Sequence, residues 1–415
     1  MGTQSTGPAT DRGQVTRRSA MLTGAGAIGG ILASGSVEAS AAQTRPSVYE
    51  RLGVKPVINA AGTLTVLGGS LMPPEVAEAW LDASRSFVDL YELEEKVSER
   101  LAGLLNVEAA LVTTGAAGAM LLATAAAVTR GKPDFIRRLP DTTGMRNEVI
   151  TQKSHHTCYD RQITNCGVKL VDVQTRADLE RAINDRTAML LFYNLFASDG
   201  DIEREEWVEV ARKHKVPTLL DAAADVPPLE ALWKYNKMGF DMVAFSGGKA
   251  LMGPNDTGLL LGRKELIEAA KLNNAPRCGT IGRMMKVGKE NTIAVLAAVE
   301  RYVRTDHQAE TREWERRLGV IEDRLKGIPT VSTERVVPPI ANHVPHVLVF
   351  WDEERIRVSR EVVTETLAGG NPPIRLGRVR GTGERGLLVS VFMLKPGEVD
   401  LVAARLIDVL KKAAV

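Results

Sequence analysis

From residue 92 onward, the chain alternates between two hydrophobic periodicities. Residues 92–105 carry apolar side chains at helical spacing, and the Ala-, Leu- and Met-rich stretch 116–128 predicts a buried helix. Short apolar runs predict strands, and polar helical segments such as 177–184 and 204–213 separate several of them; the strands are expected at 109–113, 148–151, 168–173, 188–193, 218–220, 242–245 and 258–261. Because these strands lack a polar face, the pattern predicts an α/β domain whose mostly parallel sheet is covered by helices on both sides.

The pattern changes in the C-terminal third of the chain. Residues 290–326 predict one long, charged helical stretch that can be interrupted. Beyond Pro329, strands are expected at 347–351 and 387–393, and helices at 357–367 and 398–412. We therefore predict a large α/β domain over residues 42–326, with an N-terminal arm and a linking helix, and a small α+β domain over 327–415. Ligands of such sheets bind at the carboxyl ends of the strands.

The first 41 residues have the pattern of an export signal. Arg17 and Arg18 precede an uncharged stretch, residues 20–37, which is too short and too rich in glycine for a good membrane-spanning helix. Ala39-Ser40-Ala41 then offers small residues of the kind that a signal peptidase recognises. This order predicts the twin-arginine route and a mature periplasmic or extracellular protein. The alternative is a tail with a chance arginine pair on a cytoplasmic protein.

Composition narrows the possible partners. Hydrophobic residues make up 44% of the 415-residue chain, and the formal net charge is +2. With no block of Lys and Arg after residue 45, nucleic acid is not expected as the main partner, nor is a membrane after signal removal. The three cysteines lack metal-ligand spacing and are an odd number, so we expect free thiols and no metal site.

Two residues at strand ends suggest the chemistry. Lys249 follows a predicted strand and the turn Ser246-Gly247-Gly248, and Asp221 ends the apolar run 217–220. A desolvated lysine can act as a nucleophile. Alone, each feature has an ordinary explanation, a surface loop for the lysine and a helix cap for the aspartate. In this order, on two strand ends, they fit a lysine that forms a Schiff base with pyridoxal 5′-phosphate (PLP) and an acid that protonates its pyridine nitrogen.

A phosphate cradle completes this set. Thr114-Gly115-Ala116-Ala117 lies where a predicted strand turns into a helix, and backbone N–H groups at a helix start attract an anion. Tight helix packing would also explain these small residues. Ser246 could add a hydroxyl to the phosphate, and the small residues after Asp221, including Ala223, leave room for a planar ring.

Several stretches resemble one family of PLP enzymes. They are, in order, residues 55–63, 114–119, 154–156, 221–224, 243–254 and 282–290, within a resemblance that covers roughly residues 49–415. The chain resembles the fold-type I group that contains bacterial selenocysteine synthase and D-glucosaminate-6-phosphate ammonia lyase. The resemblance implies the aspartate aminotransferase fold, a homodimer or higher homo-oligomer, Lys249 as Schiff-base lysine, Asp221 as partner of the pyridine nitrogen, and His155 stacked on the ring.

The expected substrate is a small molecule with an amino group. The resemblance favours β-elimination with release of ammonia from an amino acid or amino sugar acid, although transamination, racemisation and a selenium transferase-like reaction stay open. Selenocysteine synthase carries an additional N-terminal region for tRNA, whereas here a signal-like segment leads almost directly into the core. A catalytically weak PLP- or amino-acid-binding protein is the rival from another class. Substrate anions are expected to bind Arg283, Lys286 and Arg375, with Lys289 and Arg378 in the same two basic clusters, some of them acting across subunits.

Overall fold

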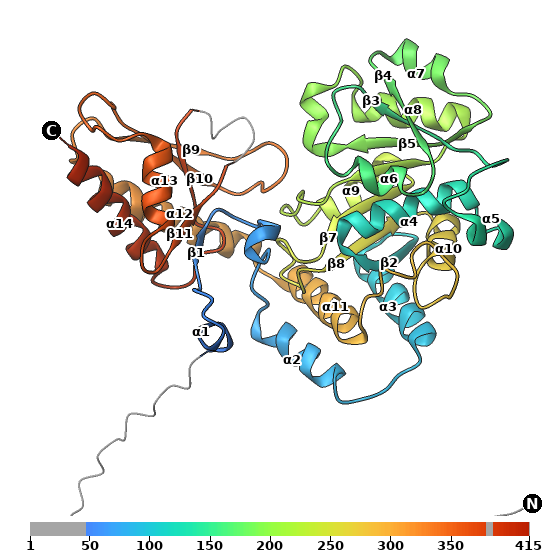
Figure 1. The fold of residues 1–415 in the computed structure, drawn as a ribbon, viewed down its shortest axis with the longest axis horizontal. Helices are drawn as coiled ribbons and strands as arrows, with labels where there is room; N and C mark the ends of the chain where they lie inside the picture. Colours follow the sequence, from blue (N-terminus) through green and yellow to red (C-terminus); the bar gives the residue numbers. More distant parts are fainter. Residues whose placement is uncertain (1–46, 379–384, 415) are drawn as a thin grey trace, which may run out of the picture. The chain divides into compact units, whose positions relative to one another are not determined.

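A seven-stranded sheet forms the centre of the larger part of this computed structural model, which describes residues 47–378 and 385–414 (Figure 1). Its strand order is β2-β8-β7-β6-β5-β3-β4. Strand β8 runs antiparallel to both neighbours and the other pairs are parallel, so the prediction of a mostly parallel sheet is confirmed. The strands are β2 (Ala109–Thr114), β3 (Glu148–Gln152), β4 (Lys169–Val173), β5 (Thr187–Tyr193), β6 (Thr218–Asp221), β7 (Met242–Ser246) and β8 (Thr257–Gly262).

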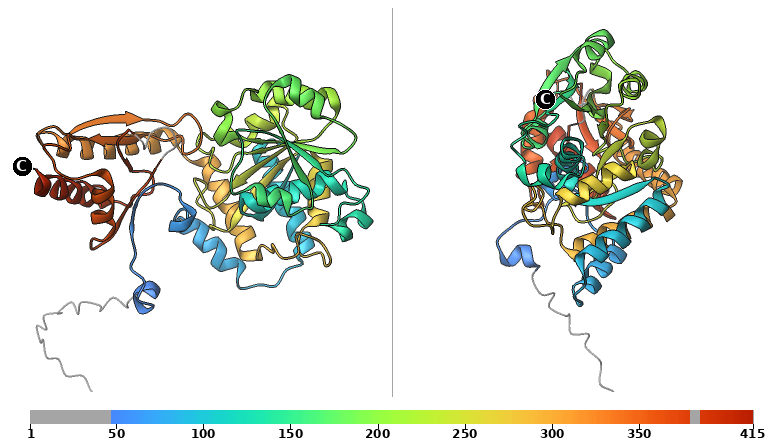
Figure 2. Two further views of the ribbon diagram at one scale, coloured as in Figure 1. Left: turned by 45° about the horizontal axis from the view of Figure 1, so that its top comes forward. Right: turned by 90° about the vertical axis from the view of Figure 1, so that its right-hand side faces the viewer.

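Helices cover both faces of this sheet, as Figure 2 shows. Successive residues of a strand point to opposite faces, and on β5 Leu191 belongs to one apolar cluster while Phe192 belongs to the other. The Leu191 side holds α4 (Gly115–Thr129), α5 (Pro133–Arg138), α6 (Asp160–Thr164) and α10 (Lys264–Asn273). The Phe192 side holds α3 (Leu90–Leu105), α7 (Arg176–Ala182), α8 (Arg204–His214), α9 (Ala231–Met238) and α11 (Lys289–Arg304). Burial on both faces explains why most of these strands have no polar side; the edge strand β4 exposes Lys169 and Asp172.

The C-terminal part has its own antiparallel sheet, β12-β10-β9. Its elements are β9 (Ser332–Val336), β10 (His346–Phe350), β12 (Leu387–Ser390), α12 (His307–Leu325), α13 (Arg360–Ala368) and α14 (Glu398–Ala413). The predicted long helical stretch is two helices, because α11 ends at Arg304 and the Asp306 side chain caps a new helix by accepting from Ala309 N–H. The strand expected at 387–393 ends at Ser390.

The N-terminal segment is shared between both parts. Strand β1 (Ile58–Ala60) pairs in parallel with β11 (Ile374–Leu376). The turn η1 (Thr65–Leu67) follows, and α2 (Pro74–Ala83) packs on α11 through Val76. A second 3-10 turn, η2 (Asn194–Asp199), follows β5.

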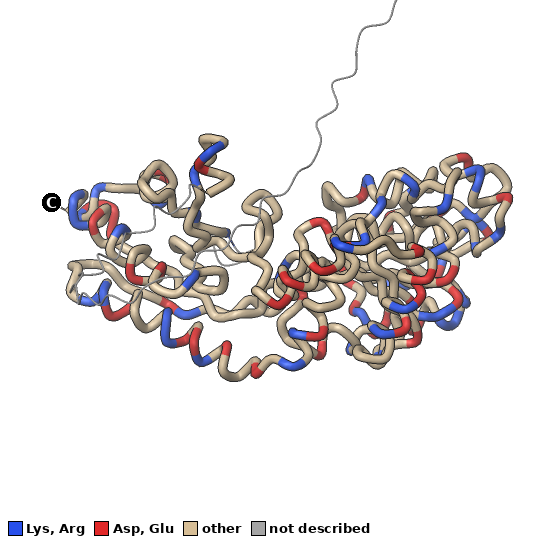
Figure 3. The backbone as a smooth tube through the Cα atoms, turned by 90° about the horizontal axis from the view of Figure 1, so that it is seen from below, with Lys and Arg blue, Asp and Glu red and all other residues tan. Residues whose placement is uncertain are grey.

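Residues 47–53 form a separate unit that contains α1 (Val48–Arg51). This helix begins with a capping box, in which Ser47 and Glu50 each accept a hydrogen bond from the other's backbone N–H. The predicted export signal, residues 1–41, lies outside the described residues. Among the residues that are described, no helix has the length and apolar character needed to cross a bilayer. Acidic and basic positions alternate along the described backbone without a long run of one sign (Figure 3).

Candidate active site

A cavity of about 430 Å³ lies at the carboxyl ends of β3, β5, β6 and β7, where the fold predicts a ligand site. It brings together seven residues that the sequence singled out for the cofactor: Gly115, Ala116, Ala117, Asp221, Ala223, Ser246 and Lys249. Thr65 and Ala341 close it from the N-terminal segment and the C-terminal part. The other lining residues are Met120, Thr157, Cys158, Tyr159, Tyr193, Leu195, Phe196, Ala224, Asp225 and Asn255.

Lys249 reaches the cavity because two glycines fold the chain back after β7. A Cβ on Gly248 would lie 2.3 Å from the Cα of Asn255, so no larger residue fits this turn. Gly247 N–H donates to Thr257 O at 2.8 Å and ties the turn to β8. Burial lowers the pKa of Lys249, and the carboxylates of Asp221 and Asp225 oppose that shift. The amine is therefore more easily deprotonated than a surface lysine.

Asp221 stands at the end of β6, where its Oδ1 accepts a hydrogen bond of 3.0 Å from Ala223 N–H. Burial raises the pKa of Asp221 to about 6, while that hydrogen bond and Lys249 act in the opposite direction. A partly buried carboxylate with one hydrogen bond gains from a cationic partner. A protonated pyridine nitrogen is such a partner, so this residue fits the cofactor that the sequence predicts.

The start of α4 provides an anion site in the same cavity. Its N-cap residue, Thr114, makes no side-chain cap, and its Oγ1 donates instead to Met285 O at 2.5 Å. The first N–H groups of this 15-residue helix therefore lack a side-chain acceptor. Gly115 has φ +65°, and a Cβ added to it would meet nothing within 4 Å. Uncapped N–H groups beside open space suit a phosphate. Thr114 anchors the cradle rather than lining the cavity.

The structure places His155 behind the wall of the cavity, and its stacking on a cofactor ring stays a prediction. The side chain is fully buried and is not among the cavity-lining residues. Phe192 packs edge-on against the imidazole at 4.7 Å, and Gln152 Nε2 lies 3.3 Å from His155 Nε2. Tyr193 N–H contacts Nδ1 at 3.4 Å. These contacts hold the ring behind the cavity wall, whose aromatic residues are Tyr159, Tyr193 and Phe196.

The second histidine, His156, also points away from the cavity. Its Nδ1 lies 2.6 Å from Asp160 Oδ2 and its Nε2 lies 2.9 Å from Asp172 Oδ1. The hydrogen bond to Asp160 raises the pKa of His156, and burial opposes it. His156 therefore fastens the loop that carries Thr157 and Tyr159 to the edge of the sheet.

Basic residues expected at the substrate are not brought together here. Arg283 and Arg375 are exposed and do not line the cavity. Lys286 is also exposed and lies instead beside a small cavity of about 50 Å³ with Glu94 and Val287. Lys249 is the only basic residue among the described residues that line the active-site cavity. The carboxylate of a substrate would therefore need a cation from outside this set.

Asp225 is a functional candidate that the sequence reasoning missed. It lies four residues after Asp221 in the same Asp-Ala-Ala-Ala-Asp segment, so the signal was present. In the structure it is buried and lines the cavity beside Lys249. Tyr159 and Tyr193 were missed too, because no local pattern tells which aromatic side chains turn toward a cavity.

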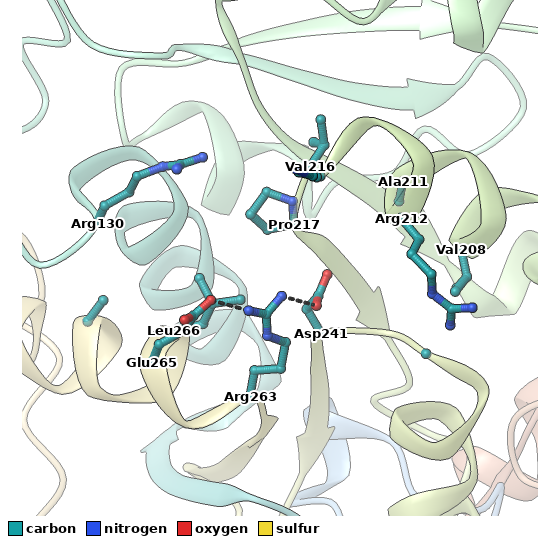
Figure 4. A pocket seen from close by; sticks show the side chains of 13 residues that line it. Arg130, Val208, Ala211, Arg212, Val216, Pro217, Asp241, Arg263, Glu265 and Leu266 are labelled. Carbon is teal, nitrogen blue, oxygen red and sulfur yellow. Dashed lines mark hydrogen bonds and ion pairs between the residues drawn. The ribbon is translucent and has the colours of Figure 1, made fainter.

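A second cavity, of about 630 Å³, lies at the other end of the strands, where β6 and β7 begin and β8 ends (Figure 4). Arg263 stands in its centre and is neutralised by Asp241 and Glu265. Arg130 and Lys215 are the C-cap residues of α4 and α8, where basic side chains suit the carbonyl end of a helix. Helix packing and capping thus account for this pocket, and we place the chemistry in the first cavity.

Known proteins support the assignment. The family model of SelA, L-seryl-tRNA selenium transferase, matches residues 57–313. D-glucosaminate-6-phosphate ammonia lyase of Salmonella typhimurium is 31% identical over 385 residues, 89% of this chain and 99% of that protein. The 5′-C-glycyluridine monooxygenase-decarboxylase of a Streptomyces species is 30% identical over 79% of this chain and 83% of its own. L-seryl-tRNA(Sec) selenium transferase of Caldanaerobacter subterraneus is 29% identical, over 59% of this chain and 58% of its own.

Solved structures agree with the predicted fold. The structure of D-glucosaminate-6-phosphate ammonia lyase has a TM-score of 0.77 at 30% identity and covers 89% of this chain. Serine palmitoyltransferase of Sphingomonas wittichii, at 14% identity and a TM-score of 0.53, shares the fold alone. The uncapped helix start, Asp221 and Lys249 fit PLP, which is the cofactor that these relationships imply. The chain therefore belongs to the SelA family and is a PLP-dependent enzyme of fold type I.

Proposed function

We propose that this enzyme removes a β-substituent from an amino acid or an amino sugar acid and releases ammonia. One observation carries the proposal: an amine with a lowered pKa, a carboxyl with a raised pKa and an uncapped helix start share a single cavity. The similarity to D-glucosaminate-6-phosphate ammonia lyase spans 99% of that protein and favours elimination. Because family members differ in their reactions, the family alone does not select this chemistry.

Each residue has a distinct task in this proposal. When bound, PLP supplies an electron sink for the carbon that carries the substrate amino group. The N–H groups of Gly115, Ala116 and Ala117 would hold its phosphate, with Ser246 as an additional donor. The Asp221 carboxylate would face its pyridine nitrogen. Lys249 Nζ would hold the cofactor and then accept the α-proton, for which its lowered pKa suits it.

The second candidate is a transferase, either selenium transferase-like or an aminotransferase. The matching family model describes a selenium transferase, which favours this candidate, and the match to residues 57–313 includes Asp221 and Lys249. The selenium transferase of Caldanaerobacter subterraneus is matched over only 58% of its length, which supports a different substrate here. Racemisation needs no group beyond those in the cavity, and neither does ligand binding without turnover. The substrate screen described next distinguishes both from elimination.

A substrate screen separates these reactions. The purified enzyme is incubated with β-hydroxy amino acids and 2-amino-2-deoxy sugar acids, with and without phosphate esters, and ammonia and keto acid are measured together. Elimination predicts both products in equal amounts. A keto acid formed only when an amino acceptor is present would instead indicate transamination, and inverted substrate without ammonia would indicate racemisation. The variant Lys249→Ala serves as the blank.

We also propose that the enzyme works as a homodimer or larger homo-oligomer. Several large apolar side chains are exposed in the single chain: Phe87 is 102% exposed, Val66 89% and Met284 81%. Met284 lies between Arg283 and Lys286, so a second copy that covered it would bring these cations into an interface. This arrangement would supply charges that the cavity of one chain lacks.

Finally, we propose that residues 1–41 direct twin-arginine export. The proposal rests on Arg17-Arg18, the uncharged stretch after them and Ala39-Ser40-Ala41. N-terminal sequencing of periplasmic and cytoplasmic fractions tests it, with Arg17→Lys/Arg18→Lys as the matched control. A start near Ala42 in the periplasm that the double variant abolishes supports export. An intact N-terminus in the cytoplasm of the wild type contradicts it.

A further inference from the structure

The active-site cavity contains two carboxylates, and only one of them has a task in the proposed reaction. Asp221 faces the place of the pyridine nitrogen, whereas Asp225 has no assigned partner there. Both line the cavity, and both act electrostatically on Lys249. When Asp221 is engaged with the cofactor, Asp225 is the acidic side chain left for the lysine.

Hydrogen bonds to one of its carboxylate oxygens hold the Asp225 side chain in one orientation. Its Oδ2 accepts hydrogen bonds from Tyr235 OH, at 2.9 Å, and from Asn194 Nδ2. The same Asn194 Nδ2 lies 2.8 Å from Tyr235 OH, and Arg204 Nη1 donates to Asn194 Oδ1 at 2.9 Å. Side chains from η2, α8 and α9 thus fix one oxygen of the carboxylate. Such a satisfied buried network is rigid.

The other oxygen, Oδ1, is available. Among the described residues it accepts no hydrogen bond, and it is not one of the fully enclosed atoms without a partner. Since Asp225 lines the cavity, this oxygen is the one that can face it. Burial raises the pKa of Asp225, and the two hydrogen bonds donated to it by Tyr235 and Asn194 oppose that shift by favouring the ionised carboxyl. A fixed acceptor with one free oxygen suits an ammonium group.

We propose that Asp225 is a positioning residue for Lys249: its free oxygen holds the amine of Lys249 once the cofactor has left it, and stabilises the ammonium form that results from proton uptake. The proposal rests on the role of Lys249 in the proposed function. The proton moves from the substrate α-carbon to Lys249 Nζ, and Asp225 gains and loses none. Asp225 orients the base without touching the reacting carbon.

The test measures Lys249 without turnover. The cofactor is removed, the apoprotein is treated with acetic anhydride over a range of pH, and acetylation of Lys249 is followed by peptide mass spectrometry. Only the neutral amine reacts, so the midpoint of the profile reports its pKa. Loss of a nearby negative charge favours the neutral amine. Asp225→Asn is expected to lower the midpoint by about one pH unit, a tenfold change in reactivity at a fixed pH below it.

Three further variants make the result specific. Asp225→Glu retains the charge and should restore a midpoint close to that of the wild type. Tyr235→Phe keeps the charge but loosens its anchor, so a smaller shift in the same direction is expected, and it replaces Asp225→Asn if that variant does not fold. Asp201→Asn removes an exposed carboxylate outside the cavity and should change nothing.

The other titratable groups of the cavity, Cys158, Tyr159, Tyr193 and Asp221, are unchanged in these variants. Equal midpoints in the wild type, Asp225→Asn and Tyr235→Phe would overturn the proposal. Such a result would leave the cofactor role of Lys249 intact, because that role is tested separately by reduction and peptide mapping.

Discussion

The backbone of Gly258 on β8 lies so close to Gly115 that a Cβ on Gly258 would be 2.3 Å from the Gly115 carbonyl carbon. Gly115 begins α4 and has φ +65°, a conformation that favours glycine. The position of the phosphate cradle is thus set by contact with the one antiparallel strand of the sheet. A side chain at Gly258 would have to displace that helix start.

We therefore expect Gly258→Ala to weaken cofactor binding by at least about tenfold and to destabilise the protein by about 1–3 kcal/mol, as overpacking does. Titration of the apoprotein with PLP and chemical denaturation measure the two effects. The control is Gly103→Ala on α3, where a Cβ meets nothing within 4 Å; it should be neutral or stabilise by up to about 1 kcal/mol. Unchanged PLP affinity in Gly258→Ala would contradict the cradle.

Asp221 carries a stability cost in the apoprotein. Its pKa is raised from 3.8 to about 6, so the folded state binds the proton more tightly than the unfolded state. Stability is therefore greatest below the lower value and falls as pH rises through about 6, by up to about 3 kcal/mol. Asp221→Asn should remove this loss, so that the apo variant is more stable than the wild type at pH 8.

The same variant should bind PLP at least about tenfold more weakly, because the pyridine nitrogen loses its anionic partner. Denaturation of both apoproteins at pH 4 and pH 8, together with PLP titration, separates the two effects. A variant that is less stable than the wild type at pH 8, yet binds PLP equally well, would sink this assignment.

His346 gives a pH dependence of the opposite sign, in the C-terminal part. It is buried on β10, its Nδ1 has no hydrogen-bond partner among the described residues, and burial lowers its pKa from 6.5 to about 4. Folding favours the neutral imidazole. The folded protein is therefore fully stable with respect to this group above pH 6.5, and its free energy of unfolding decreases as the pH falls toward 4. The loss is about 3 kcal/mol.

In His346→Gln, the difference in unfolding free energy between pH 7 and pH 4.5 should be smaller than in the wild type. The comparison is His343→Gln, which changes an exposed histidine a few residues earlier. Equal pH dependence in the wild type and His346→Gln would show that this imidazole is not the group concerned.

The apolar surface around Phe87 predicts self-association. A fully exposed phenylalanine is unusual on a monomer, and its neighbours along the chain, Val88 and Tyr91, are 49% and 52% exposed. Phe87→Ser should shift the protein toward the monomer in analytical ultracentrifugation, while Val362→Ser, a 49% exposed residue on α13, should not. A monomeric wild type at micromolar concentration would contradict the proposed oligomer.

The sequence predicted the elements of the large sheet well, because most of its strands are buried on both faces and therefore read as short apolar runs. The edge strand β4, which exposes Lys169 and Asp172, is the exception. Lys249 and Asp221 were found for the same reason: both follow such runs. The pairing of β1 with β11 was not predicted, since residues 58 and 374 meet only through the fold. No local pattern marks that contact.

The burial of the His155 side chain was likewise not visible in the local sequence. The family resemblance placed His155 at the cofactor ring, whereas the contacts with Phe192 and Gln152 turn its imidazole into the core. Asp225 was overlooked although Asp221 was not, because its role depends on Asn194 and Tyr235, which are distant in sequence.

The central claim is that Lys249 binds PLP covalently. The direct measurement is the absorption spectrum of the purified protein before and after borohydride, followed by peptide mass spectrometry. The account predicts a yellow band that reduction removes and a reduced cofactor attached at Lys249, absent from Lys249→Ala. A protein that stays colourless after addition of PLP, or a cofactor attached at another lysine, would contradict it.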